Sequence, residues 1–128
     1  MFELRKINEE SFENDIFCCN YKSNKNINIV VFIKYLQSLG YVIDKVGIGN
    51  NSDMYERTLM PEYKLDDFAT CYNNIISSPE YTRTQINIKY NGDGVIIYVK
   101  DNNIQVISYD NPVYLEDILK KKDHSIKF

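Results

Sequence analysis

The sequence predicts a two-layer α+β domain, with helices packed on one face of a small sheet that contains an antiparallel β-meander over about 82–109. Three apolar runs that alternate with polar residues or are rich in β-branched residues predict the strands. Short turn-forming segments at 91–94 and 101–103 separate these runs. Apolar residues at helical spacing elsewhere predict the helices, and helices gathered on one side of an antiparallel sheet make an α+β domain.

The meander is predicted by its turn as much as by its strands. Ile86, Ile88 and Tyr90 alternate with polar neighbours, and Asn91-Gly92 follows at once. Asn and Gly accept the positive φ that tight hairpin turns require, so this pair between two β-rich runs predicts a hairpin. The run 95–99, the polar segment 101–103 and the alternating run 104–108 extend it to three strands.

The N-terminal segment predicts a short strand followed by a helix. Phe2 and Leu4 alternate with polar residues, which favours a strand over 1–7. Phe12, Ile16 and Cys19 fall on one face of a helix, and Asn8 precedes them as a potential N-cap. We therefore expect a helix over 9–19.

The next segment predicts a helix and then a strand. Ile29, Phe32, Ile33 and Leu36 follow the i, i+3, i+4, i+7 spacing of an amphipathic helix over 28–39. Gly40 stands where a glycine commonly ends a helix. The run 41–48 is rich in β-branched residues and predicts a strand.

The remaining elements complete a single domain over 1–128. Residues 49–63 are rich in Asn and acids and predict a loop, and 64–78 predict a helix. Asn111-Pro112 is a typical start for a final helix. The expected core consists of Phe32, Ile33, Leu36, Phe68, Tyr72, Ile75, Ile86, Ile88, Val95, Ile97 and Val106.

Composition indicates a cytoplasmic protein. Cys18, Cys19 and Cys71 make an odd number without metal-binding spacing, which favours a reducing compartment. No apolar run is long enough to span a bilayer, so we expect no membrane association. The net charge is −3, and the basic residues form a run only in the tail at 120–127. Nucleic-acid-binding proteins usually carry a basic stripe along a face, so we expect no nucleic-acid partner.

No set of residues predicts catalysis, a metal site or a cofactor. The one histidine, His124, lies near the C-terminus, where chains are seldom ordered. Cys71 lies beside the apolar stripe of a predicted helix, where a cysteine behaves as a small hydrophobe. The adjacent acids Asp66-Asp67 and Glu116-Asp117 point in different directions on a helix. We therefore expect that the protein is not an enzyme.

Two stretches that combine tyrosines with acids predict a surface for binding a protein partner. Aromatic side chains supply contact energy at interfaces, and carboxylates steer a basic partner. The predicted partner is accordingly a basic protein domain, bound by a monomer or weak dimer. The candidate partner-binding residues are Asp53, Tyr55, Glu56, Glu62 and Tyr63 in the predicted loop, and Tyr109, Asp110, Glu116 and Asp117 after the meander.

In these general features the chain is similar to the immunity proteins of bacterial toxin–immunity systems, including those of contact-dependent growth inhibition. The shared features are length, acidity, an α+β pattern and no catalytic set. The resemblance implies an inhibitor that covers the active site of a nuclease-type toxin. Two alternatives remain open: a small enzyme that uses convergent carboxylates or Cys71, and a phage or mobile-element accessory protein that binds a host factor.

Overall fold

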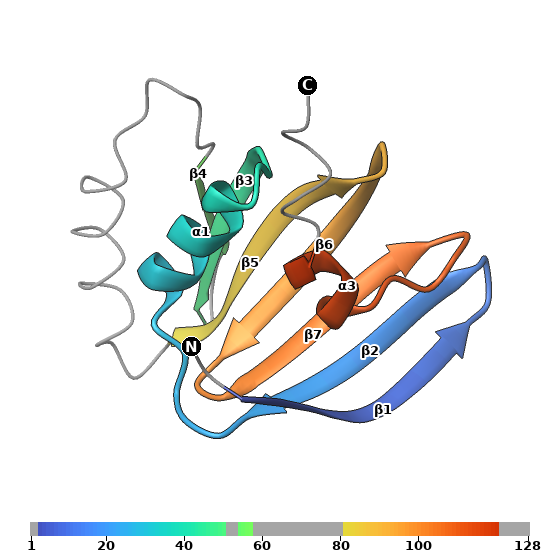
Figure 1. Cartoon of the computed structure of the whole chain (residues 1–128), viewed down its shortest axis with the longest axis horizontal. Coiled ribbons are helices and arrows are strands. Elements are labelled where there is room, and N and C mark those ends of the chain that lie inside the picture. Colours follow the sequence, from blue (N-terminus) through green and yellow to red (C-terminus); the bar gives the residue numbers. More distant parts are fainter. Residues whose placement is uncertain (1–2, 51–53, 58–80, 121–128) are drawn as a thin grey trace.

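The computed structural model describes residues 3–50, 54–57 and 81–120, which form one antiparallel sheet and two short helices (Figure 1). This confirms the coarse α+β class, with the sheet dominating. The described helices are α1 (Ile29–Ser38) and α3 (Leu115–Lys120). The strands are β1 (Leu4–Phe12), β2 (Ile16–Ser23), β3 (Ile43–Asn50), β4 (Met54–Arg57), β5 (Tyr81–Tyr90), β6 (Asp93–Lys100) and β7 (Asn103–Tyr109).

The predicted meander is confirmed and lies at the centre of the sheet. The strand order in the described chain is β1-β2-β7-β6-β5-β3-β4, so the sheet is larger than the sequence predicts. Asn91 (φ 52°) and Gly92 (φ 88°) turn β5 into β6, as their tolerance of positive φ requires. The sheet grows on both sides because β2 pairs with β7 and β3 pairs with β5.

The predicted helix over 9–19 is wrong, because these residues form most of the β1–β2 hairpin. Asn14 (φ 66°) and Asp15 (φ 56°) occupy the turn, and Asn and Asp tolerate this left-handed backbone better than most residues. Cys19 pairs with Val106 of β7, so β2 lies inside the sheet. Hydrogen bonding on both edges outweighs the short helical spacing, since tertiary context routinely overrides local propensity. A bulge between Lys6 and Asn8 interrupts the pairing of β1.

Helix α1 and strand β3 confirm the predictions for 28–39 and 41–48. The side chain of Asn28 accepts hydrogen bonds from the backbone N–H groups of Val30 (3.0 Å) and Val31 (3.1 Å). This satisfies donors that a helix start leaves unpaired. Gly40 has φ 97°, the left-handed conformation that ends many helices.

Two further predictions require correction. The predicted loop over 49–63 contains β4, which pairs with β3 through Gly47 and Glu56. The last helix begins at Leu115 and not at Asn111-Pro112, because the backbone N–H of Val113 donates to Ser108 Oγ (3.1 Å) and the chain remains irregular up to the helix. The predicted helix over 64–78 lies outside the described residues, as do the expected core residues Phe68, Tyr72 and Ile75.

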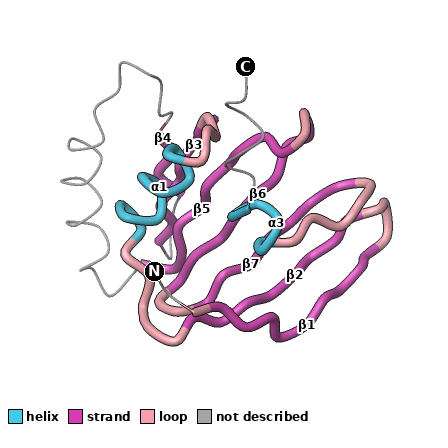
Figure 2. Tube along the Cα trace, viewed as in Figure 1, coloured by secondary structure: helices cyan, strands magenta, loops and turns pink. Residues whose placement is uncertain are grey.

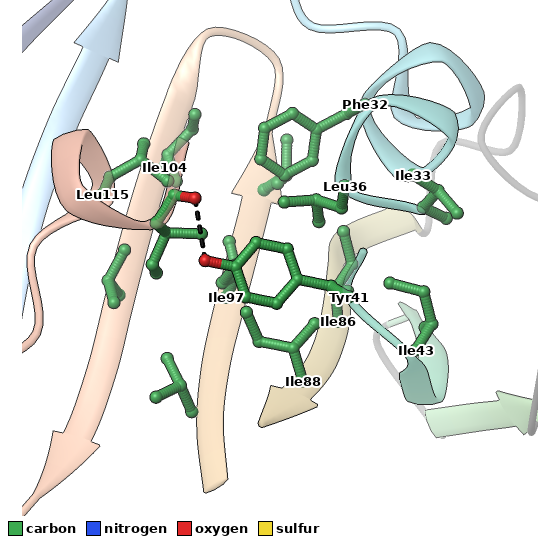
Figure 3. Packing of buried hydrophobic residues seen from close by; sticks show 14 of the residues in the cluster. Phe32, Ile33, Leu36, Tyr41, Ile43, Ile86, Ile88, Ile97, Ile104 and Leu115 are labelled. Atoms are coloured by element: carbon green, nitrogen blue, oxygen red, sulfur yellow. Dashed lines mark hydrogen bonds between the residues drawn. The ribbon is translucent and has the colours of Figure 1, made fainter. Parts of the chain in front are cut away.

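The core lies between the sheet and both described helices. The expected core residues within the described chain are all buried: Phe32, Ile33 and Leu36 of α1, Ile86 and Ile88 of β5, Val95 and Ile97 of β6, and Val106 of β7. They belong to one cluster, which also includes Leu115 and Ile118 of α3 (Figure 3). Residues of both helices therefore belong to the same buried cluster as residues of β5, β6 and β7, and Figure 2 shows both helices beside the sheet.

Two buried tyrosines attach α3 to this face. Tyr21 Oη donates to Glu116 Oε1 (2.6 Å) and accepts from the backbone N–H of Leu115 (3.0 Å). Tyr41 Oη donates to the carbonyl oxygen of Ile118 (2.8 Å; Figure 3). Burial is the main cause that raises the pKa of both phenols, so they remain protonated donors at neutral pH.

The core arrangement predicts a large difference between two adjacent helix positions. Phe32→Ala should lower the free energy of unfolding by about 3–5 kcal/mol, because truncating a buried aromatic side chain leaves a cavity. The matched control is Val31→Ala, since Val31 is 57% exposed on the same helix. Its cost should stay within about 0.5 kcal/mol. Urea denaturation of both variants measures the difference, and a cost below about 1 kcal/mol at Phe32 contradicts this packing.

The attachment of α3 gives a second prediction. Tyr21→Phe removes one hydroxyl and leaves the buried N–H of Leu115 without its acceptor. The expected loss is about 1–3 kcal/mol, the usual cost of an unsatisfied buried polar group. Tyr109→Phe is the control, because Tyr109 is 47% exposed. Equal unfolding free energies for the two variants would show that the Tyr21 hydroxyl does not stabilise α3.

Candidate functional site

The face of the sheet opposite the core carries a set of side chains ordered by the strand register. Along β5, β6 and β7 the buried residues alternate with half-buried or exposed ones. The half-buried and exposed residues point away from α1 and α3, and we call the surface that they form the open face. Because antiparallel pairing places partners directly opposite one another, residues of the open face line up in rows across the strands.

One of these rows is basic. Arg5 of β1 pairs with Lys22 of β2, Lys22 pairs with Asn103 of β7, and Asn103 pairs with Lys100 of β6. Arg83 of β5 lies opposite Lys100, since the adjacent residues Thr84 and Val99 are partners. We call these five residues the basic row. It brings four cations together from four different strands.

The next row carries amide side chains. Asn8, Asn20, Gln105, Tyr98 and Gln85 lie side by side on β1, β2, β7, β6 and β5, and we call them the amide row. Asn20 Nδ2 donates to Asn8 Oδ1 (2.6 Å), and Gln105 Nε2 donates to Asn20 Oδ1 (3.1 Å). These bonds join the amides of three strands, which fixes their orientation.

All of the basic row and three residues of the amide row, Asn20, Gln105 and Tyr98, line a hollow with a volume of about 620 Å³. Among the described residues that line it, Arg5, Lys22, Arg83 and Lys100 are basic and none is acidic. The guanidinium carbon of Arg83 lies 3.9 Å from the centre of the Tyr98 ring, which is the distance of a cation–π contact. The hollow is therefore positively charged, and one of its walls is formed by the Arg83 guanidinium stacked on the Tyr98 ring.

The opposite end of the open face is aromatic and acidic. Phe12 pairs with Ile16, and Ile16 pairs with Tyr109, so two aromatic side chains flank an isoleucine across β1, β2 and β7, and we call these three residues the aromatic row. Phe12 is 54% exposed and Tyr109 is 47% exposed. The exposed acids Glu10, Glu13, Asp15 and Asp110 lie on the same strand ends and turns. A second hollow of about 280 Å³ is lined by Asp44, Asp93 and Asp110 together with Tyr109.

The predicted partner-binding residues lie in several places. Tyr109 belongs to the aromatic row, and Asp110 follows it with φ 70°. Glu116 holds the buried Tyr21 hydroxyl on the core side, and Asp117 is exposed on the same helix. The backbones of Tyr55 and Glu56 lie in β4, which is separated from β7 by β6, β5 and β3. Asp53, Glu62 and Tyr63 lie outside the described residues.

Sequence reasoning missed the basic row. Its four basic residues are far apart in sequence and come from four different strands, so no basic run along the chain contains them. Arg5 and Arg83 lie near the starts of β1 and β5, and Lys22 and Lys100 lie near the ends of β2 and β6, so antiparallel pairing brings all four to one edge of the sheet. That signal becomes visible only after the strands and their pairing have been identified.

The described residues show no arrangement typical of a metal site or an activated nucleophile. No three His, Cys, Asp or Glu side chains among them come together as metal ligands. Cys18 and Cys19 are buried free thiols, and burial raises the pKa of Cys19 from 9.0 to about 11. Burial also raises the pKa of Cys18. Both thiols therefore stay protonated near neutral pH, and only the thiolate is a strong nucleophile.

No helix within the described ranges is long and apolar enough to cross a membrane.

Comparison of the chain with protein-family models, with curated proteins and with solved structures finds no match. Any function for this chain must therefore be argued from its own residues.

Burial of the two thiols gives a third prediction. In a Cys71→Ser variant at pH 8, Cys18 and Cys19 should both react with the thiol reagent DTNB more slowly when folded than in denaturant, because burial raises the pKa of both thiols. For Cys19 the reaction should be about 100-fold slower, because a pKa raised from 9.0 to about 11 leaves about 100-fold less thiolate. Absorbance at the released thionitrobenzoate band measures the rates. Reaction of the folded variant at the rate of the unfolded chain would show that these thiols are accessible.

Proposed function

We propose that this protein is a small cytoplasmic inhibitor of the immunity type, which binds a basic toxin domain and covers its active site. The aromatic row, bordered by acids on the open face, is the observation that supports the proposal. In this proposal the domain acts as a two-layer α+β unit: the helices and the core stabilise one face of the sheet, and the other face remains available for the partner.

The aromatic row has the composition of an interaction surface. Phe12 and Tyr109 belong to the few large apolar side chains of the described chain that remain about half exposed. Aromatic residues dominate binding energy at protein interfaces when a partner desolvates them fully. Both lie on strands of a packed sheet, so they lose little backbone freedom on binding, and this lowers the cost of association.

The surrounding carboxylates favour a basic partner. Glu10, Glu13, Asp15 and Asp110 are exposed around the aromatic row, and Asp44 and Asp93 line the neighbouring hollow. A cluster of acids raises the association rate of a positively charged protein and disfavours other partners. Nuclease active sites bind phosphates with basic side chains, so the carboxylates around the aromatic row can occupy such a site as the phosphates of a substrate do.

The experiment that tests the proposal begins with the neighbouring genes. A toxin domain encoded next to this chain should stop growth of a bacterial host, and co-expression of this protein should restore it. The double variant Phe12→Ala, Tyr109→Ala should bind the purified toxin domain at least about 30-fold more weakly, since interface hot spots cost 2 kcal/mol or more. Calorimetry measures the affinity.

The matched control is the double variant Val31→Ala, Val42→Ala. These valines are 57% and 67% exposed and lie on α1 and just before β3, away from the aromatic row. The control should bind the toxin domain with unchanged affinity. If the two double variants bind equally well, the aromatic row is not the binding surface.

Charge variants distinguish the acids beside the aromatic row from the acids of the predicted stretch at 53–63. Asp15→Asn with Asp110→Asn removes two charges while keeping residues that tolerate the left-handed backbone of both positions. This pair should slow association and weaken its salt dependence. The triple reversal Asp53→Lys, Glu56→Lys, Glu62→Lys tests the other stretch in the same assay. The stretch whose variant leaves both on-rate and affinity unchanged does not contact the partner.

A further inference from the structure

We propose that the basic row and the amide row together bind single-stranded nucleic acid, with phosphates along the basic row and bases over the amide row. This inference is independent of the proposed function, because it concerns the opposite end of the open face. It rests on the charge of the 620 Å³ hollow, on the register that produces the rows, and on the Arg83–Tyr98 stack.

The basic row has the extent that a nucleic-acid backbone requires. It crosses β1, β2, β7, β6 and β5, and neighbouring strands lie about 4.8 Å apart, so the row is about 19 Å long. Arg5, Lys22 and Arg83 are exposed, and Lys100 is half-buried. Basic residues in a continuous line neutralise successive phosphates, which is the main source of affinity for nucleic acids.

The amide row lies where the bases would fall. It lies two residues from the basic row on β2, β7, β6 and β5 and three residues from it on β1, where a bulge interrupts the pairing, so the two rows are about 7 Å apart. Asn and Gln side chains both donate and accept hydrogen bonds, as the edges of bases do. The Arg83 guanidinium and the Tyr98 ring form a flat pair, and single-stranded bases stack on aromatic rings and on guanidinium planes.

These features favour nucleic acid over an acidic peptide. Stacking on the Arg83–Tyr98 pair requires a flat ring, which every nucleotide base supplies and the Asp and Glu side chains of an acidic peptide lack. The acidic end of the open face also sets the direction of the ligand. Asp44, Asp93 and Asp110 lie towards the other ends of the strands and repel phosphates. A bound strand therefore runs across the β-strands and not along them.

The test uses the full-length protein and fluorescein-labelled twelve-residue oligomers, one of thymidylate and one of uridylate. Fluorescence anisotropy should show binding whose logarithmic affinity falls with the logarithm of salt concentration with a slope of about −3, since each of four cations contributes about −0.7 for single strands. Comparison of the two oligomers shows whether DNA or RNA is preferred. Absence of binding to both oligomers at about 50 mM salt overturns the proposal.

Two triple variants with equal charge separate the site from general electrostatics. Arg5→Gln, Lys22→Gln, Lys100→Gln should flatten the salt slope by about 2 and abolish tight binding. The control is Lys25→Gln, Lys34→Gln, Lys89→Gln, which removes the same charge from exposed positions outside the hollow. Equal losses in the two variants would overturn the proposal.

Two single variants test stacking. Tyr98→Leu should weaken binding about tenfold without changing the salt slope, because one stacked base is lost while the phosphate contacts remain. Arg83→Lys retains the charge, removes the planar group, and should also weaken binding at an unchanged slope. If neither variant weakens binding, or if a polyglutamate peptide of equal charge competes as well as unlabelled oligomer, the ligand is not nucleic acid. The Phe12→Ala, Tyr109→Ala variant should retain oligomer binding. Loss of toxin binding and loss of oligomer binding are therefore caused by different variants, and either proposal can be wrong while the other holds.

Discussion

The pairing of β2 with β7 determines the rest of this structure. It joins the N-terminal hairpin to the central meander, and it aligns Cys19 with Val106 and Tyr21 with Ile104 on the core side. Because side chains alternate between the two faces of a strand, a slip of one residue would move Cys19 and Tyr21 from the core to the open face. The same slip would separate Tyr21 from Leu115 and Glu116, which fix α3. Core, helix attachment and surface rows all follow from one register.

That register also explains why the open face differs so much from one end to the other. Each row collects mainly residues of one kind from strands that are distant in sequence, so the polarity of the face arises from alignment and not from local composition. The acidic net charge of −3 conceals this arrangement. A chain of mildly negative charge thus carries a positive hollow and an acidic aromatic end on the same sheet.

The sequence predicts the elements that local patterns specify. The Asn91-Gly92 turn and the helical spacing of Ile29, Phe32, Ile33 and Leu36 led to the meander and to α1, and the structure contains both. The β1–β2 hairpin was missed because Phe12, Ile16 and Cys19 fit a helical spacing over a short stretch. Its signal was present in Asn14-Asp15, two residues suited to a tight turn. Tyr109 and Asp110 of the candidate site were predictable from their position after the meander. The basic row was not, because Arg5, Lys22, Lys100 and Arg83 become neighbours only through long-range pairing.

The position of β2 also has a consequence for how the chain is made. The β1–β2 hairpin is synthesised before the other described strands, yet the strand that pairs with its inner edge, β7, is the last of the described strands to leave the ribosome. An isolated two-stranded hairpin is at best marginally stable in water. During synthesis the hairpin therefore has no lasting partner for the inner edge of β2 until β7 has emerged. Contacts so distant in sequence make folding slow, and the exposed strand edge is vulnerable to pairing with other nascent chains until β7 occupies it.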